Sequence, residues 1–407
     1  MSKVVVIGGG PAGIMAAILA SKNHSVTLVE KNEKLGKKLF ITGKGRCNVT
    51  NNIDISEFFD HIPRNPNFLY SSFYTFTNED TKSLFEKSGV KLKVERGDRI
   101  FPESDKSSDI IKVLENKLIE HNVNILLNKK VVNIKNENDT IKYIEFEDGS
   151  NLKGDHFILC TGGASYPQTG STGEGYKFCD KLGHTIEKIK PSLVPMETEE
   201  TWIKELQGLS LKNVEVKFKH KNKVLYKDFG EMLFTHFGVS GPLILSASAK
   251  IDEKLTKEGL SLFINLKPAL ELNELDKRIQ KDFQKYLNKD FKNALNDLLP
   301  NKLIDIVIKL SEIDPNKKVN LITKEERKRL LNILTSLELH IKKYRPIAEA
   351  IITAGGISTK EIDSSTMKSK KIKNLSFAGE VIDIHGYTGG YNLQIAFSTG
   401  YLAGISI

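Results

Sequence analysis

Cysteine is scarce in this sequence of 407 residues, which contains only Cys47, Cys160 and Cys179. No two of them form a C-x-x-C pair, and their spacing does not match a set of zinc ligands. This scarcity argues against a disulfide reductase and against a metalloenzyme. We therefore expect no metal site.

Long hydrophobic runs are also missing. No stretch approaches the roughly 18 consecutive apolar residues that a membrane-spanning helix needs. The first apolar run, Val4 to Ile7, leads directly into a glycine-rich motif and leaves no room for a signal peptide. We expect a cytoplasmic protein with no membrane partner.

The sequence has no acidic excess, because its net charge is +9. Between Lys277 and Lys343, 16 basic and 9 acidic residues account for seven of these nine charges. A basic segment can bind nucleic acid, but lysine-rich, solvated helix faces produce the same excess. The aromatic residues Phe283, Tyr286 and Phe291 are expected in the core of this segment and not on a base-stacking surface. We therefore do not expect a nucleic-acid partner.

The N-terminal residues predict a strand, a glycine turn, a helix and a second strand. The turn Gly8-Gly9-Gly10-Pro11-Ala12-Gly13 satisfies G-x-G-x-x-G. The first glycine permits the tight turn, Gly10 lets a pyrophosphate approach the backbone, and Gly13 allows close packing of the helix. Glu30 ends the second strand, where a carboxylate can bind a ribose and repels a 2′-phosphate. This pattern predicts FAD or NAD and disfavours NADP.

The C-terminal segment favours FAD over NAD. A strand at Leu375 to Ala378 is followed by Asp383 and then by Gly389-Gly390-Tyr391-Asn392, which opens the last helix. FAD is longer than one glycine turn can hold, so a returning segment can supply Asp383 for its ribityl chain or phosphates. The positive end of the last helix can face the flavin edge, which becomes anionic on reduction. These features disfavour a plain NAD dehydrogenase.

The order of expected strands and helices along the whole chain divides it into three regions. Residues 1–190 and 346–407 are expected to form a bipartite Rossmann-like FAD-binding domain of the α/β class. Residues 191–345 are expected to form a β-rich inserted domain with a helical insert at about 270–337. Within the insert, Leu275, Ile279, Phe283 and Leu287 recur every four residues, and Thr323 with Glu326 forms a capping box.

Five ordered motifs make the chain recognisable. These are Gly8 to Gly13, Thr42 to Asn51, Phe234 to Pro242, Thr353 to Ile357 and Ala378 to Gln394. Together they resemble the BaiN-like, HI0933-type family of FAD-dependent flavoproteins over nearly the whole chain. The resemblance implies a bipartite FAD domain, a β-barrel-like middle domain and a small helical insert. One departure is Lys44, where the family commonly has glycine.

The resemblance also implies contacts for individual residues. Arg46, Cys47 and Asn48 would approach the flavin, while Gly379, Asp383 and Gly390 to Leu393 would flank the ribityl chain and ring. The cofactor-binding residues that we expect are Gly8, Gly10, Pro11, Ala12, Gly13, Glu30, Lys31, Lys38, Thr42, Gly43, Gly45, Arg46, Cys47, Asn48, Val131, Thr161, Gly162, Gly379, Glu380, Asp383, Gly389, Gly390, Tyr391, Asn392 and Leu393.

The expected activity is a flavin-dependent reduction of an apolar or conjugated organic substrate, with a bile acid or steroid as one example implied by the resemblance. No second G-x-G-x-x-G motif exists, so NAD(P)H would visit only transiently as electron donor. His236 and Tyr391 are candidates for proton delivery. Cys47 could be reactive beside Lys44 and Arg46, but a packing role is the preferred interpretation. An alternative function is an RNA-associated flavoprotein that uses the basic helical insert.

Overall fold

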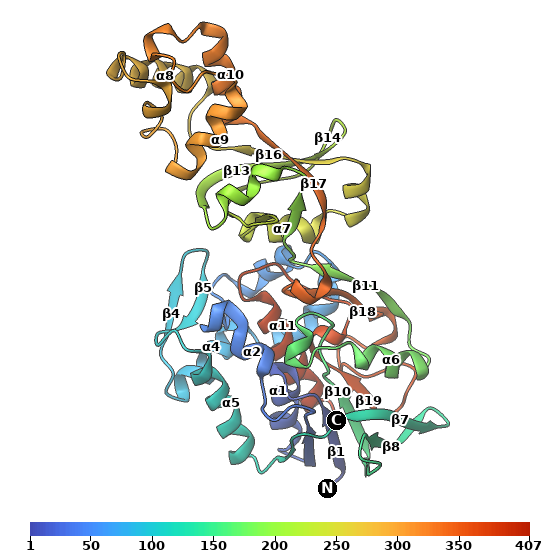
Figure 1. Cartoon of the computed structure of the whole chain (residues 1–407). Coiled ribbons are helices and arrows are strands. Elements are labelled where there is room, and N and C mark those ends of the chain that lie inside the picture. The colour runs from blue at the N-terminus through green and yellow to red at the C-terminus, as the bar shows by residue number, and fades with distance from the viewer. The chain divides into compact units, whose positions relative to one another are not determined.

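A computed structural model describes residues 1–407. The chain divides into two compact units (Figure 1). The first comprises Met1–Ser192 and Pro346–Ile407, and the second comprises Leu193–Arg345. No helix is both long enough and apolar enough to cross a membrane.

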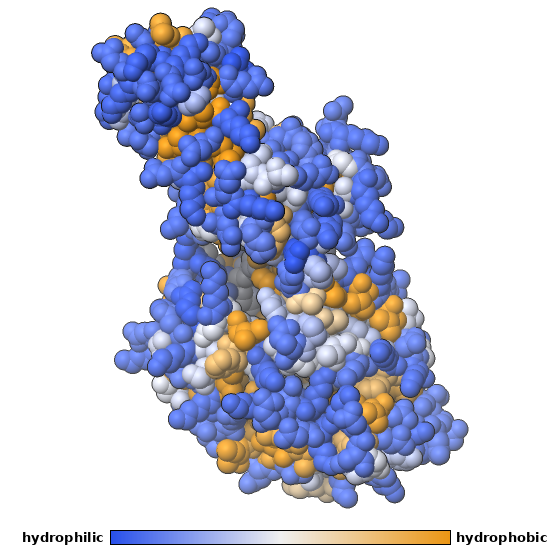
Figure 2. Space-filling view, in the orientation of Figure 1, coloured by the Kyte–Doolittle hydropathy of each residue, from blue (hydrophilic) through white to orange (hydrophobic).

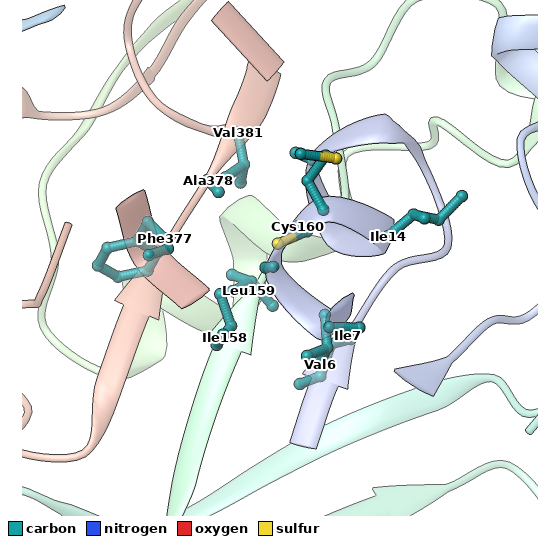
Figure 3. Packing of buried hydrophobic residues seen from close by; sticks show 14 of the residues in the cluster. Val6, Ile7, Ile14, Ile158, Leu159, Cys160, Phe377, Ala378 and Val381 are labelled. Atoms are coloured by element: carbon teal, nitrogen blue, oxygen red, sulfur yellow. The ribbon is translucent and has the colours of Figure 1, made fainter. Parts of the chain in front are cut away.

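A parallel five-stranded sheet forms the centre of the first unit, with the strand order β19-β10-β1-β2-β6. Its strands are β1 (Lys3–Ile7), β2 (Ser25–Val29), β6 (Asn124–Leu126), β10 (His156–Leu159) and β19 (Leu375–Phe377). The central strands are continuous apolar runs because both faces of a parallel sheet are covered. Figure 3 shows Val6, Ile158 and Phe377 on three neighbouring strands, and each is fully buried. The C-terminal segment therefore completes the N-terminal sheet, as the sequence predicted.

Helices α1 (Pro11–Ala20) and α11 (Tyr391–Ile405) pack closely together in this unit. A Cβ added to Gly400 would lie 2.3 Å from the carbonyl oxygen of Ala12, which no real contact allows. The missing side chain at Gly400 thus permits the close approach of the two helices. The other helices of the unit are α2 (Lys37–Ile41), α3 (Tyr70–Thr75), α4 (Asn78–Lys87), α5 (Ser107–Glu120) and α6 (Glu174–Lys181).

Three small antiparallel sheets complete the first unit. Their strands are β3 (Thr50–Asn51), β4 (Leu92–Glu95) and β5 (Arg99–Pro102) in one sheet, β7 (Val131–Glu137), β8 (Thr140–Phe146) and β9 (Asn151–Lys153) in another, and β11 (Ile186–Ser192) with β18 (Ile352–Ile357) in the third. Strand β18 begins only at Ile352, because Pro346 precedes a short 3-10 turn at Ile347–Glu349.

A closed six-stranded barrel forms the body of the second unit, which confirms the β-barrel-like expectation. Its strands are β12 (Met196–Thr198), β13 (Ser210–His220), β14 (Lys223–Phe234), β15 (Gly238–Ser240), β16 (Leu260–Asn265) and β17 (Leu337–Tyr344), with helix α7 (Pro242–Lys250) against β14. In β17, Leu337, Leu339 and Ile341 are buried and alternate with exposed residues. This alternation lies just beyond the expected end of the insert.

The helical insert contains α8 (Leu272–Lys285), α9 (Asn301–Ser311) and α10 (Lys324–Thr335). Thr323 and Glu326 form the expected capping box at the start of α10. Leu275, Ile279 and Phe283 are buried on one face of α8. Leu287 does not continue this face, because the helix ends at Lys285 and the Leu287 side chain is exposed.

The contact of α1 with α11 predicts the effect of substituting Gly400. Gly400→Ala should lower the free energy of unfolding by about 1–3 kcal/mol, since the new methyl group must push the helices apart. Chemical denaturation measures the change. Asn116→Ala, at an exposed position of α5, is the matched control and should leave stability nearly unchanged. An equally stable Gly400→Ala variant would contradict the close packing.

Burial of His156 predicts a dependence of stability on pH. Burial lowers the pKa of His156, on β10, from 6.5 to about 4, and its Nε2 lies 2.9 Å from Ser376 Oγ. Between these two pH values the unfolded chain therefore binds more protons at His156 than the folded protein does. The contribution of neutral His156 to the free energy of unfolding is complete above pH 6.5 and falls toward pH 4. His156→Gln should reduce this loss by about 3 kcal/mol, measured by denaturation at several pH values. An unchanged pH profile would show that His156 is not held neutral.

Candidate cofactor-binding site

One pocket of the first unit opens at the carboxyl ends of the parallel strands. Gly8 follows β1, Glu30 follows β2, Thr161 follows β10 and Gly379 follows β19, and all four line the pocket. Ligands of open α/β sheets bind at this edge, because the loops that follow neighbouring strands meet there. The pocket thus joins the N-terminal and C-terminal segments of the chain.

The glycine turn brings the start of α1 close to the sheet. Gly8 has a φ of +110°, which favours glycine, and a Cβ on Gly13 would lie 1.9 Å from the Gly8 carbonyl oxygen. Gly10 differs, because a Cβ placed there would meet no atom within 4 Å. Its backbone instead faces open space in the pocket. Gly8 and Gly13 are therefore needed for the fold, whereas Gly10 leaves room for a ligand.

Glu30 holds the glycine turn in place. Its carboxylate is buried, and its Oε2 accepts a hydrogen bond from the Gly9 N–H at 2.7 Å. Its Oε1 accepts from the Asn32 N–H at 2.8 Å and from Asn32 Nδ2 at 2.7 Å. Glu30 also lines the pocket, where contact with a ribose remains a prediction.

Two helix N-termini open into the pocket without a side-chain cap. Helix α1 starts after Gly10, and α11 starts after Gly390, which has a φ of +101°. The pocket is lined by Ala12 from the end of α1, and by Asn392 and Leu393 from the end of α11. Uncapped N–H groups and the helix dipole make such ends binding sites for anions. The pocket is therefore suited to a ligand with negative charge at two places.

The residues of the pocket fit FAD. The hydroxyl of Thr161 is buried in the pocket wall without a hydrogen-bond partner within the protein, and its oxygen packs against Gly175 of α6. The open space beside Gly10 and the uncapped end of α1 suit a pyrophosphate. Apolar side chains, including Leu39, Ile352 and Ile384, line other parts of the wall and suit a ring system.

Lys38 and Glu380 form an ion pair in the pocket wall. Lys38 Nζ lies 2.8 Å from Glu380 Oε2 and donates to Ser165 Oγ at 2.7 Å. Glu380 Oε1 also accepts from the Thr353 N–H at 2.8 Å. The pair joins α2 to the segment that follows β19, and it leaves little unpaired charge at this point of the wall.

The pocket brings together fifteen of the residues that the sequence indicated as cofactor ligands. These are Gly8, Gly10, Pro11, Ala12, Glu30, Lys31, Lys38, Thr42, Val131, Thr161, Gly162, Gly379, Glu380, Asn392 and Leu393. The others, which lie outside its lining, are Gly13, Gly43, Gly45, Arg46, Cys47, Asn48, Asp383, Gly389, Gly390 and Tyr391. Their contacts with a cofactor remain predictions.

The loop around Arg46 is held by other contacts. Arg46 Nη1 lies 2.8 Å from Glu95 Oε1, and its guanidinium lies over the ring of Phe101. Cys47 is fully buried, and burial raises the pKa of its thiol to about 12. This supports the packing role over a reactive thiolate. The Asn48 amide, oriented to satisfy both of its ends, accepts from the Gly390 N–H at 2.9 Å.

Asp383 and Tyr391 are buried beside the pocket. Asp383 Oδ2 lies 2.6 Å from Arg64 Nε, and burial raises the pKa of its carboxyl group despite this pair. Tyr391 stacks on His61 with 4.4 Å between ring centroids, and burial raises the pKa of its hydroxyl above the ordinary range. His236 belongs to the second unit, where its side chain is exposed beside Phe237. The roles of His236 and Tyr391 in proton delivery, and that of Asp383 beside the ribityl chain, remain predictions.

One segment of the pocket wall was not predicted from the sequence. Thr169, Gly170, Ser171, Thr172 and Glu174 line the pocket together with Asn32 and Lys129. The glycines of Gly170-Ser171-Thr172-Gly173-Glu174-Gly175 were the available signal. His385 was also missed, although it follows the pocket residue Ile384 and both of its ring nitrogens are buried without a partner.

Comparison with known proteins gives consistent matches. A family model described as the HI0933-like protein Rossmann domain matches residues 2–406. A 3-dehydro-bile acid delta(4,6)-reductase of Clostridium scindens is 30% identical, over 99% of this chain and 98% of the relative. A ribosomal RNA dihydrouridine synthase of Haemophilus influenzae is 29% identical, over 100% of this chain and 98% of the relative.

Among solved structures, the 3-ketosteroid delta1-dehydrogenase of Sterolibacterium denitrificans superposes with a TM-score of 0.52 over 99% of both chains, at 12% identity. This likeness concerns the fold alone. The family model covers nearly the whole chain, and its matched residues include both helix ends of the pocket. The chain therefore belongs to the HI0933-like family of FAD-dependent oxidoreductases.

Proposed function

We propose that this flavoprotein saturates a carbon–carbon double bond conjugated with a carbonyl group, in an apolar organic substrate. One observation carries the proposal. Two relatives that match the whole chain are named for different substrates, yet both names describe this reaction type. A 3-oxo steroid with double bonds at positions 4 and 6 and the uracil base of uridine each present an alkene conjugated with a carbonyl group.

The domains have separate roles in this proposal. Residues 1–190 and 346–407 form the FAD-binding domain, and residues 191–345 form an insertion. The two compact units support this division. Bound FAD supplies hydride transfer. The end of α1 would hold the pyrophosphate, and the end of α11 would stabilise negative charge on the reduced ring. Asp383 would bind the ribityl chain, and this contact would replace its present pair with Arg64.

Saturation of a double bond adds a hydride and a proton, so the reaction also needs an electron donor and an acid. A nicotinamide, NADH or NADPH, would deliver the hydride that finally adds to one alkene carbon, and an acid would protonate the neighbouring carbon. The nicotinamide would bind transiently, since the chain has a single G-x-G-x-x-G turn. His236 and Tyr391 are the proposed proton sources, although the raised pKa of the Tyr391 hydroxyl makes it the weaker acid.

Anaerobic reoxidation tests this proposal. The purified holoprotein is reduced with NADH or NADPH, and candidate acceptors are then mixed with it while flavin absorbance is followed. We expect conjugated enones to reoxidise the flavin, and the matching saturated ketones to leave it reduced. Gly10→Val is the cofactor control, because its side chain enters open space and should displace FAD while leaving the fold intact. Indifference to every apolar conjugated enone would overturn the proposal.

RNA is the second candidate substrate, because the Haemophilus relative is named for ribosomal RNA. The charge of the insert gives it little support. In Figure 2, the side chains over α8 and α10 are mostly hydrophilic. Several of the lysine and arginine side chains, however, form ion pairs with acidic side chains inside the insert. These pairs are Arg278–Asp282, Lys285–Asp297, Lys317–Glu326, Lys318–Asp290 and Arg327–Asp276.

A binding experiment separates the two substrates. We expect binding to a ribosomal RNA transcript to be weak and unchanged by Lys324→Gln with Lys328→Gln, two exposed lysines without an ion pair. Specific RNA binding would instead weaken steeply with salt, since each phosphate contact releases a counterion. A salt-dependent complex that loses affinity in the double variant, together with dihydrouridine in the product, would make RNA the substrate.

A further inference from the structure

A short segment lines the pocket beside Glu30. Residues 169–174, here called the strap, follow β10 and end in the first residue of α6. Five of the six residues line the pocket, and Lys31 and Asn32 line it from the neighbouring end of β2. The strap and these two residues therefore meet at the edge where the ribose of a dinucleotide is expected.

Side-chain contacts join the strap to the end of β2. Lys31 Nζ lies 2.5 Å from Glu174 Oε2 and donates to Thr172 Oγ1 at 2.7 Å. Asn32 Nδ2 donates to the Thr169 carbonyl oxygen at 3.2 Å. Two of the three donors of the Lys31 ammonium group are thus directed at the strap.

The backbone of the strap also fits closely against these residues. Gly170 has a φ of +100°, and a Cβ at this position would lie 2.5 Å from Asn32 Nδ2 and 3.3 Å from Lys31 Cε. On its other side, Ser171 Oγ lies 3.2 Å from the position of a Cβ on Gly162. The strap is therefore seated against both the end of β2 and the loop after β10.

We propose that Lys31 acts as a latch that holds the strap closed and thereby limits the rate at which FAD leaves the pocket. Lys31 would then retain the cofactor through Glu174 and Thr172, and not by binding a phosphate itself. Both side chains of the ion pair are partly exposed, so the latch is moderate in strength and sensitive to salt. The inference depends on FAD binding alone and is independent of the substrate.

The rate of FAD release tests the latch without any enzyme assay. Holoprotein is diluted, and the rise in fluorescence of free FAD gives the dissociation rate. Glu174→Gln and Lys31→Met should each release FAD about 3- to 10-fold faster. The charge swap, Lys31→Glu with Glu174→Lys, should restore the rate to within about twofold, because it rebuilds the ion pair. If Lys31 instead bound a phosphate of FAD directly, the glutamate that the swap places at position 31 would repel that phosphate, and release would remain fast.

A double-mutant cycle covers the case in which the swapped protein does not fold. Lys31→Met combined with Glu174→Gln should release FAD no faster than Lys31→Met alone, since that variant already removes the ion pair together with the hydrogen bond to Thr172. Glu120→Gln breaks the surface pair Lys117–Glu120 on α5 and should leave the rate unchanged. Higher ionic strength should accelerate release from the wild type but not from Glu174→Gln. Additive single effects, or an unchanged rate in Glu174→Gln, would overturn the latch.

Discussion

The close approach of α1 to the end of β1 is the contact on which the site depends. It exists because Gly13 presents no side chain to the Gly8 carbonyl oxygen, only 1.9 Å from where a Cβ would lie. Gly400 then lets α11 pack against Ala12 of the same helix. These two glycine contacts hold α1 against the sheet and α11 against α1, so the packing of the first unit also shapes the pocket.

The convergence of two helix ends explains why segments so distant in the sequence share one site. FAD carries a pyrophosphate, and its ring becomes anionic on reduction, so two separate positive ends are of use along its length. The neighbouring side-chain charges are largely paired, as in Lys38 with Glu380 and Lys31 with Glu174. We therefore attribute the attraction for the cofactor mainly to backbone N–H groups, and the durability of the complex to the strap.

The sequence predicted those features that depend on local patterns. The turn from Gly8 to Gly13, the end of β2 at Glu30 and the capping box at Thr323 each follow from residues close together in the chain. The glycines of the strap were a local signal, but its contact with Lys31 and Asn32 was not predictable, because these partners lie far away in sequence and meet the strap only in the fold. Likewise, the ion pair of Arg46 with Glu95 and that of Asp383 with Arg64 arise only from tertiary packing.

Calorimetric titration of the apoprotein with FAD, FMN and ADP tests the central claim most directly. The claim is that the glycine turn, Glu30 and the end of α1 hold the adenosine diphosphate half of the cofactor. It predicts that FAD binds tightly, that ADP competes with it, and that FMN, which lacks this half, binds far more weakly. Binding of FMN as tight as that of FAD, with no competition from ADP, would contradict the account.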